Sequence, residues 1–269
     1  MKSLFSTLVL AVIMISGCSV SPQYNDPIPE HDSFIIQSEN VKEPRVINVW
    51  TPPQYAQGDN PLPVLYMPDG GIKEDFPHIA NTLAELIKTE KIPPFILVGI
   101  ENTVRTRDLT GYTKYEEDKE VAEETGESSN FRAFINEELI PYINENYKPK
   151  AQKGIIGESL AGLFVVETFM LNPSNFDYYI AFDPSLWWNK HDYDINAEKY
   201  LADFPKRETK IWIATSSAGG MSGAGHNLDK AFQNLSNENL IWKYSDEPKE
   251  KHHTIFRATK EKALIWTLN

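Results

Sequence analysis

Hydrophobic and polar residues alternate along the chain in blocks that predict strands and helices in turn. Short apolar or alternating runs predict strands at 33–37, 45–50, 62–67, 95–100, 154–156, 178–182, 210–215 and 240–244. Longer stretches with apolar residues at helical spacing predict helices at 79–91, 130–147, 160–171, 228–235 and 259–268. This order indicates an α/β fold, in which a mostly parallel sheet of about eight strands has helices on both faces. We expect the first two strands to form an antiparallel pair.

Two stretches interrupt this alternation. Residues 101–129 are polar and rich in Glu, Thr and Arg, so we expect an excursion over the surface there. Pro141 lies inside the predicted helix at 130–147, and we expect a bend because proline removes one backbone donor. The sequence contains no internal repeat and no sign of a second domain, so we expect residues 32–269 to form a single domain.

The N-terminus has the pattern of an export signal. Lys2 precedes an apolar run at 8–15, which is too short for a membrane span. The stretch Ile15-Ser16-Gly17-Cys18 resembles the bacterial lipobox, in which the cysteine is lipidated and becomes the new N-terminus. The alternative is an ordinary signal peptide with an incidental cysteine; Cys18 is the only cysteine, so no intrachain disulfide can form. We expect a lipoprotein signal peptide at 1–17, a flexible tether at 18–31 and a lipid-anchored protein of the bacterial cell envelope, on its periplasmic or outer face.

Length and charge limit the partners that the chain can have. It has 269 residues, 41% of them apolar, which is enough for one large core. The formal net charge of −12 argues against nucleic acid and against anionic membrane surfaces, because like charges repel at long range. Contact with a membrane is therefore expected only through the lipid anchor. Arg105 and Arg107 in the polar excursion could hold an anionic group, although exposed arginines are usually only solvated.

The stretch Gly157-Glu158-Ser159-Leu160-Ala161-Gly162 lies between a predicted buried strand and a predicted helix. This is the setting of a nucleophile elbow, a sharp turn that presents a serine hydroxyl at the N-terminus of a helix. The turn needs small residues two positions before and two after the serine, and Gly157 and Ala161 meet this need. We expect Ser159 to be a nucleophile, with the Leu160 N–H placed to stabilise a developing negative charge. The alternative is a serine that only caps the helix.

Four stretches carry a resemblance to a known family. They are 66–71 (YMPDGG), 157–162 (GESLAG), 181–188 (AFDPSLWW) and 252–255 (HHTI). Over about residues 33–268 the chain resembles the Putative esterase (esterase D-like) family of α/β-hydrolases, nearest its siderophore-esterase-like bacterial branch. The resemblance implies an α/β-hydrolase fold and a serine esterase that cleaves a small-molecule carboxylic ester through an acyl-enzyme.

The base and the second oxyanion donor follow from this resemblance. Only His252 and His253 come after the last predicted strand, where this fold places its histidine. The family pattern of His, any residue, Ser or Thr, then Ile or Val implies His252 as the base, with His253 as the alternative. The turn at 69–71 resembles the family's oxyanion turn, and we choose the Gly71 N–H as the donor that acts beside the Leu160 N–H. The alternative is that these residues form only a turn.

The acid of the expected catalytic group is not identified by the sequence. In this fold it usually follows the strand that ends near Thr215, but the loop at 216–227 contains no carboxylate. The nearest candidates are Asp229, Asp246, Glu247 and Glu250. Some siderophore esterases of the family work with a serine and a histidine alone, and we slightly favour such a pair here.

The remaining motifs say less about function. The sequence contains no metal-binding cluster, glycine-rich phosphate loop or dinucleotide fingerprint, so we expect no metal and no cofactor. Trp187 and Trp188 could wall a substrate pocket, but packing between sheet and helix explains them equally well. The acidic chain makes a neutral ester a better expected substrate than a strongly anionic siderophore. Two other functions stay open: a peptidase or thioesterase on the same fold, and a non-catalytic binding lipoprotein.

Overall fold

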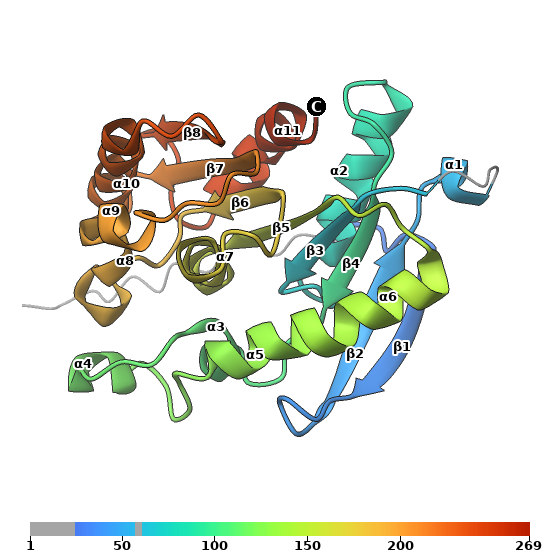
Figure 1. Cartoon of the computed structure of the whole chain (residues 1–269). Coiled ribbons are helices and arrows are strands. Elements are labelled where there is room, and N and C mark those ends of the chain that lie inside the picture. Colours follow the sequence, from blue (N-terminus) through green and yellow to red (C-terminus); the bar gives the residue numbers. More distant parts are fainter. Residues whose placement is uncertain (1–24, 57–60) are drawn as a thin grey trace, which may run out of the picture.

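The computed structural model describes residues 25–56 and 61–269, which form one eight-stranded sheet with helices on both sides (Figure 1). The strands lie in the order β1-β2-β4-β3-β5-β6-β7-β8. β2 pairs antiparallel with β1 and β4, and all other neighbours are parallel. The predicted α/β-hydrolase architecture is confirmed. The strands are β1 (Asp32–Gln37), β2 (Pro44–Trp50), β3 (Val64–Pro68), β4 (Ile96–Ile100), β5 (Lys153–Glu158), β6 (Tyr178–Phe182), β7 (Thr209–Ser216) and β8 (Leu240–Glu247).

Helices connect the parallel strands, and several short ones lie on the surface. The long ones are α2 (Phe76–Lys88), α5 (Ser128–Phe134) continued by η1 (Ile135–Leu139) and α6 (Ile140–Tyr147), α7 (Leu160–Leu171), α10 (Met221–Leu235) and α11 (Ile255–Leu268). The short ones are α1 (Pro53–Ala56), α3 (Arg105–Leu109), α4 (Glu116–Lys119), η2 (Trp188–Lys190), α8 (Asp192–Ile195) and α9 (Ala197–Tyr200). The predicted polar excursion thus carries α3 and α4.

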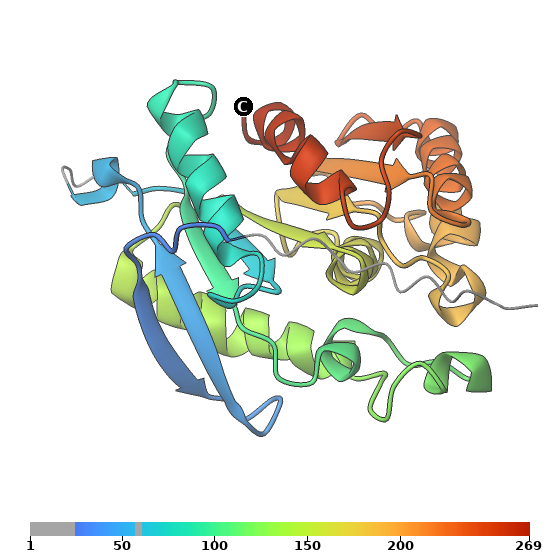
Figure 2. The ribbon, with the colours of Figure 1, turned by 180° about the vertical axis from the view of Figure 1, so that it is seen from behind.

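Two apolar clusters fill the two faces of the sheet. One joins strand residues such as Leu65 and Ile156 to α2 and α11. The other joins residues such as Tyr66 and Ile155 to α5, α6, α7 and α10. Neighbouring residues of one strand alternate between the two cores, as the strand period of two requires. Figures 1 and 2 show these two helical layers from opposite sides. Burial on both faces explains why the central strands are uninterrupted apolar runs.

The helix predicted at 130–147 is interrupted just before Pro141. Residues Ile135–Leu139 form a π-helical segment between α5 and α6. Phe131, Phe134 and Ile143 from the predicted apolar stripe are buried on both sides of it. π-helical turns are rare, and inside an α-helix they mark a local break in the regular hydrogen-bond pattern. The stripe predicted from the sequence is therefore retained across the irregular segment.

Two helices begin four or more residues earlier than the sequence predicted. The helix expected from 228 begins at Met221, and the helix expected from 259 begins at Ile255. The first turns of α10 contain glycines, which hid the helical pattern. A Cβ placed on Gly225 would lie 2.5 Å from the Tyr244 ring, so this glycine lets α10 pack closely on β8. The short helices between 188 and 200 were also not predicted.

The chain before β1 contacts the helices of one layer. Asp26 forms an ion pair with Arg257 on α11, and the Asn81 side chain on α2 donates to the Pro27 carbonyl at 2.7 Å. Residues 25–31, assigned from the sequence to the tether, therefore lie against the domain. The predicted signal peptide, Cys18 and the rest of the tether lie outside the described residues. Within the described parts of the chain, no helix has the length and apolar character needed to span a membrane.

Candidate active site

The turn between β5 and α7 has the geometry of a nucleophile elbow. Ser159 has φ 59° and ψ −118°, a conformation that is strained for a residue with a side chain. A Cβ on Gly157 would lie 2.6 Å from the backbone carbon of Ala161 and 2.8 Å from its side chain. The two positions predicted to need small residues therefore contact each other directly. Gly162 is also confined, because a Cβ there would lie 3.0 Å from the Phe182 carbonyl oxygen.

His252 lies on the loop between β8 and α11 and contacts Ser159. Its Nε2 is 3.0 Å from Ser159 Oγ, and its Nδ1 is 2.8 Å from Asp183 Oδ2. With the proton on Nδ1, the ring donates to the carboxylate and accepts from the serine hydroxyl, the tautomer that a general base needs. His253, the alternative base, is exposed. The structure thus brings the two predicted catalytic side chains, Ser159 and His252, into hydrogen-bond contact.

Asp183 follows β6 directly and completes a chain of three side chains. Its side chain is fully buried, and it accepts hydrogen bonds from the Ser216 N–H at 2.7 Å and the Ser216 hydroxyl at 2.6 Å, besides the one from His252. Three donors compensate for removing this carboxylate from water. The order along the sequence, serine then aspartate then histidine, is the order found in α/β-hydrolases.

The sequence slightly favoured a Ser159–His252 pair without an acid, and it offered four candidate acids. Neither expectation matches this geometry. Within the described chain, each of the four contacts groups other than His252: Asp229 accepts from Trp242 and Gln233, Asp246 from Ser222, Glu247 from Ser245 and Lys262, and Glu250 from Thr254. The sequence did hold a signal for Asp183. It stands directly after the buried run at 178–182 and before Pro184, at the end of the strand next to the one that leads to Ser159. A charged residue at the end of a buried strand needs a partner.

The two predicted oxyanion donors differ in whether their N–H group already has an acceptor. Leu160 is the first residue of α7, so its N–H has no acceptor within the helix and lies next to Ser159. The Gly71 N–H instead donates to Glu74 Oε2 at 2.7 Å. Burial raises the pKa of Glu74, and the nearby Asp69 raises it further. The role of Gly71 stays a prediction, and an oxyanion could use this N–H only after displacing the Glu74 carboxylate.

The turn after β3 nevertheless lies beside the elbow. β3 and β5 are parallel neighbours, and Tyr66 pairs with Ile155. Continuing that register along both strands brings Asp69 level with Glu158, the residue before the nucleophile. The ends of both strands thus meet at one edge of the sheet, where ligands of open α/β sheets usually bind.

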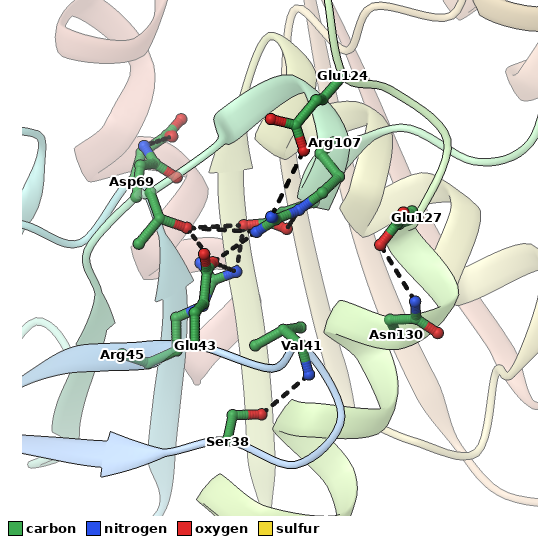
Figure 3. Close-up of polar contacts among 12 residues, drawn as sticks. Ser38, Val41, Glu43, Arg45, Asp69, Arg107, Glu124, Glu127 and Asn130 are labelled. Atoms are coloured by element: carbon green, nitrogen blue, oxygen red, sulfur yellow. Dashed lines mark hydrogen bonds and ion pairs between the residues drawn. The ribbon is translucent and has the colours of Figure 1, made fainter.

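The tryptophans and arginines singled out in the sequence are engaged by the protein itself. Trp188 is buried, and its indole N–H donates to the Gly111 carbonyl at 2.9 Å. This hydrogen bond links the polar excursion to the loop after β6. Trp187 is partly buried against the core. Arg105 pairs with Asp69. Arg107 pairs with Asp108, Glu43 and Glu124, in the cluster drawn in Figure 3.

Glu158, immediately before Ser159, is a partly buried residue that the sequence did not single out. Burial raises the pKa of Glu158 to about 8, and the negative charges of Asp75, Asp69 and Asp183 act in the same direction, while Arg105 opposes them. The Glu158 carboxyl is therefore mainly protonated at neutral pH. Across the described residues, no group of three or more His, Cys, Asp or Glu side chains could hold a metal ion.

Comparison with known proteins places this geometry among esterases. The sequence profile of the family described as "Putative esterase" matches residues 38–266. The ferri-bacillibactin esterase BesA of Bacillus subtilis is 31% identical over 160 residues, 52% of either chain. The apo-salmochelin esterase of Escherichia coli is 29% identical over 163 residues, 55% of this chain and 49% of that one. The chain thus spans about half the length of these curated relatives.

A solved structure agrees over more of the chain. An IroE-like serine hydrolase from Shewanella oneidensis superposes with a TM-score of 0.80 at 25% identity, covering 88% of this chain and 79% of that one. A BES protein from Bacillus cereus, with a TM-score of 0.79 at 23% identity, shows the same fold over 91% of this chain and 98% of that one. The eight-stranded α/β-hydrolase sheet is therefore shared over nearly the whole described domain.

Proposed function

Because the chain belongs to the Putative esterase family, we propose that it is a serine esterase with a catalytic triad of Ser159, His252 and Asp183. The observation that carries the proposal is the continuous hydrogen-bonded path from Ser159 Oγ through both ring nitrogens of His252 to Asp183, at 3.0 and 2.8 Å. A serine hydroxyl is a weak nucleophile on its own and needs such a base. The strained elbow exposes the hydroxyl at the N-terminus of α7, where negative charge is favoured.

In the first half of the reaction, Ser159 Oγ attacks the ester carbonyl carbon while His252 Nε2 takes the hydroxyl proton. The Leu160 N–H, and the Gly71 N–H once Glu74 has released it, stabilise the oxyanion of the tetrahedral intermediate. The intermediate collapses as the imidazolium gives its proton to the leaving alkoxide. The products are a free alcohol and an ester between the acyl group and Ser159.

In the second half, water attacks the acyl-enzyme and His252 takes its proton. Collapse of the second tetrahedral intermediate returns that proton to Ser159 and releases the carboxylic acid. Asp183 holds the Nδ1–H and stabilises the imidazolium in both halves. Ser216 fixes Asp183 through two hydrogen bonds, so the carboxylate cannot turn away from the ring.

We propose a small-molecule ester as the substrate, and siderophore esters as the first class to test. Support comes from the names of the relatives, which give ferri-bacillibactin and apo-salmochelin as the compounds that those enzymes cleave. The net charge of −12 favours a neutral ester over a strongly anionic one. A panel of neutral and catecholate esters, run beside peptides and thioesters, separates these substrates and the rival peptidase and thioesterase functions.

The test of the mechanism uses a fluorophosphonate probe and an ester panel on wild type and Ser159→Ala. Wild type should be labelled and should hydrolyse an ester, whereas Ser159→Ala should lose labelling and at least about a thousandfold in kcat. Asn146→Ala, far along α6, serves as the matched surface control. A wild-type protein that neither labels nor hydrolyses any ester would support the non-catalytic binding function instead.

We also propose that Cys18 carries a lipid that anchors the mature protein in the cell envelope. The lipobox-like stretch supports this proposal. Cells grown with a palmitate analogue should label wild type but not Cys18→Ala. Equal labelling of both would contradict it.

A further inference from the structure

Arg105, at the start of α3, joins the turn after β3 to the nucleophile elbow. Its Nε and Nη2 donate to the two carboxylate oxygens of Asp69, each at 2.7 Å. The same Nη2 lies 3.4 Å from the carbonyl oxygen of Glu158, the residue before Ser159. One guanidinium therefore contacts both strand ends between which the reacting carbonyl must lie. Two parallel N–H···O bonds to one carboxylate also fix the orientation of the arginine.

Asp69 depends on this arginine. Its side chain is buried, and its backbone has φ 59°, in the left-handed region that is unfavourable for most residues with a side chain. Asn102 is the other side-chain donor to the carboxylate. Without Arg105, the buried carboxylate would keep a single side-chain donor, and the strained backbone would lose the constraint that this side chain provides.

The opposite side of the turn is held by its backbone. The Gly70 N–H donates to the Ile100 carbonyl at 2.8 Å, and the Asn48 side chain donates to the Gly70 carbonyl at 3.0 Å. A Cβ on Gly70 would lie 2.2 Å from the Ile100 nitrogen, so the turn fits tightly against β4. β4 thus fixes one side of the turn, and Arg105 links the other side to β5.

We propose that Arg105 is a positioning residue for ester hydrolysis, which acts through Asp69 to hold the turn carrying the Gly71 N–H against the elbow carrying Ser159. The inference rests on the proposed esterase function and goes beyond it. In this inference, the charged side chain of Arg105 sets the distance between the two sides of the oxyanion site. It also accounts for the two parallel hydrogen bonds between Arg105 and Asp69.

Arg107 offers a matched control on the same short helix. It pairs with Asp108 and Glu43, on the side of β2, and its side chain is mostly buried. In Figure 3 the cluster of Arg107, Glu43 and Arg45 lies apart from Asp69. Arg107→Gln thus removes a comparable ion pair of the excursion without touching the turn or the elbow.

The experiment measures kcat and KM for a neutral ester and an anionic ester in wild type, Arg105→Gln, Arg105→Lys and Arg107→Gln. Loss of one oxyanion donor costs about a hundredfold or more, so Arg105→Gln should lower kcat by roughly that factor with KM within about threefold for both esters. Arg105→Lys should recover part of the loss, since lysine keeps the charge but cannot make two parallel bonds. Arg107→Gln should keep kcat within about threefold.

A second variant keeps the test decisive if Arg105→Gln folds poorly. Asp69→Asn should show the same fall in kcat, and the double variant should fall little further, because both changes break one link. An unchanged kcat in folded Arg105→Gln overturns the inference. A rise in KM confined to the anionic ester also overturns it, because Arg105 would then bind substrate. An inactive wild type overturns the proposed function itself, and the inference with it.

Discussion

Two carboxyls, that of the buried Asp183 and that of the partly buried Glu158, stand at neighbouring strand ends beside Ser159. Glu158 ends β5 opposite Phe182 of β6, and Asp183 is the residue after Phe182. Asp183 accepts hydrogen bonds from His252 and from two groups of Ser216. The carboxyl of Glu158 accepts none from the described residues, and burial raises its pKa to about 8.

The difference teaches that hydrogen-bond donors, and not depth alone, decide what a carboxyl beside Ser159 can do. A carboxylate that receives hydrogen bonds can act on a neighbouring histidine as a fixed negative charge. A carboxyl without them keeps its proton near neutral pH and adds no charge beside the reacting serine. Both residues are acidic and lie near Ser159, yet only Asp183 is hydrogen-bonded to His252, the proposed base.

The largest expected effect comes from neutralising Asp183. Asp183→Asn should lower kcat by about 10⁴-fold, because the amide favours the wrong histidine tautomer and cannot stabilise the imidazolium. Glu158→Gln should leave kcat at pH 7 within about threefold, since it replaces a neutral acid by a neutral amide of the same shape. Steady-state hydrolysis of one neutral ester by both purified variants makes the comparison.

Asp246→Asn is the control for removal of a carboxylate from the same end of the molecule, because Asp246 contacts Ser222 and not His252. It should match wild type. If Asp183→Asn stays within tenfold of wild type, the protein works with a serine and a histidine alone, as the sequence led us to expect.

A smaller effect should appear when Glu158 ionises. Above pH 8 its carboxylate puts a negative charge beside the developing oxyanion, so wild-type kcat should fall by roughly tenfold between pH 7 and pH 9.5. Glu158→Gln should lack this fall. The measurement is a pH profile of kcat for both proteins with a neutral ester, corrected for spontaneous hydrolysis. Parallel alkaline limbs in the two proteins would mean that another group titrates.

The smallest effect concerns stability. The pKa of Glu158 is about 8 in the folded protein against an ordinary value of 4.5, so the folded state holds an extra proton between these two pH values. Stability falls with rising pH wherever the folded state binds more protons than the unfolded state. Wild type should therefore lose several degrees of Tm relative to Glu158→Gln between pH 5 and pH 9, since 1 kcal/mol shifts Tm by about 2–4 °C.

Thermal unfolding followed by circular dichroism at pH 5, 7 and 9 measures this difference. Other groups titrate in both proteins and cancel in the comparison. A constant difference across the pH range would mean that Glu158 is ionised throughout.

Much of the fold could be predicted because the central strands are buried on both faces. The runs at 95–100 and 178–182 have no polar interruption, so their period and length identify strands without tertiary information. The elbow was also predictable, since the contact between Gly157 and Ala161 is local. The first turns of α10 were not, because Gly225 there allows a close tertiary contact with Tyr244 and does not favour helix formation.

The site was predictable where its members follow a local pattern and hidden where they meet through space. Ser159 and His252 stand in short motifs. The contacts of Asp183 form only because the end of β6, the end of β7 at Ser216 and the loop after β8 come together in the fold. No spacing in the sequence indicates that these three segments meet. The hydrogen bond from the Gly71 N–H to Glu74 is local, yet the sequence does not show whether this N–H is free or already has an acceptor.

The position of Asp183 has a consequence for how the protein is made. Ser159 and Asp183 directly follow two consecutive strands, β5 and β6, which are joined by α7. Such a connection has one handedness in nearly all proteins, so a single local unit sets the position of Ser159 relative to Asp183. His252 comes from beyond β8 and leaves the ribosome later than either. In a growing chain, Ser159 therefore has no base at first. The proposed hydrolytic site is complete only when β8 and the loop that follows it have joined the sheet.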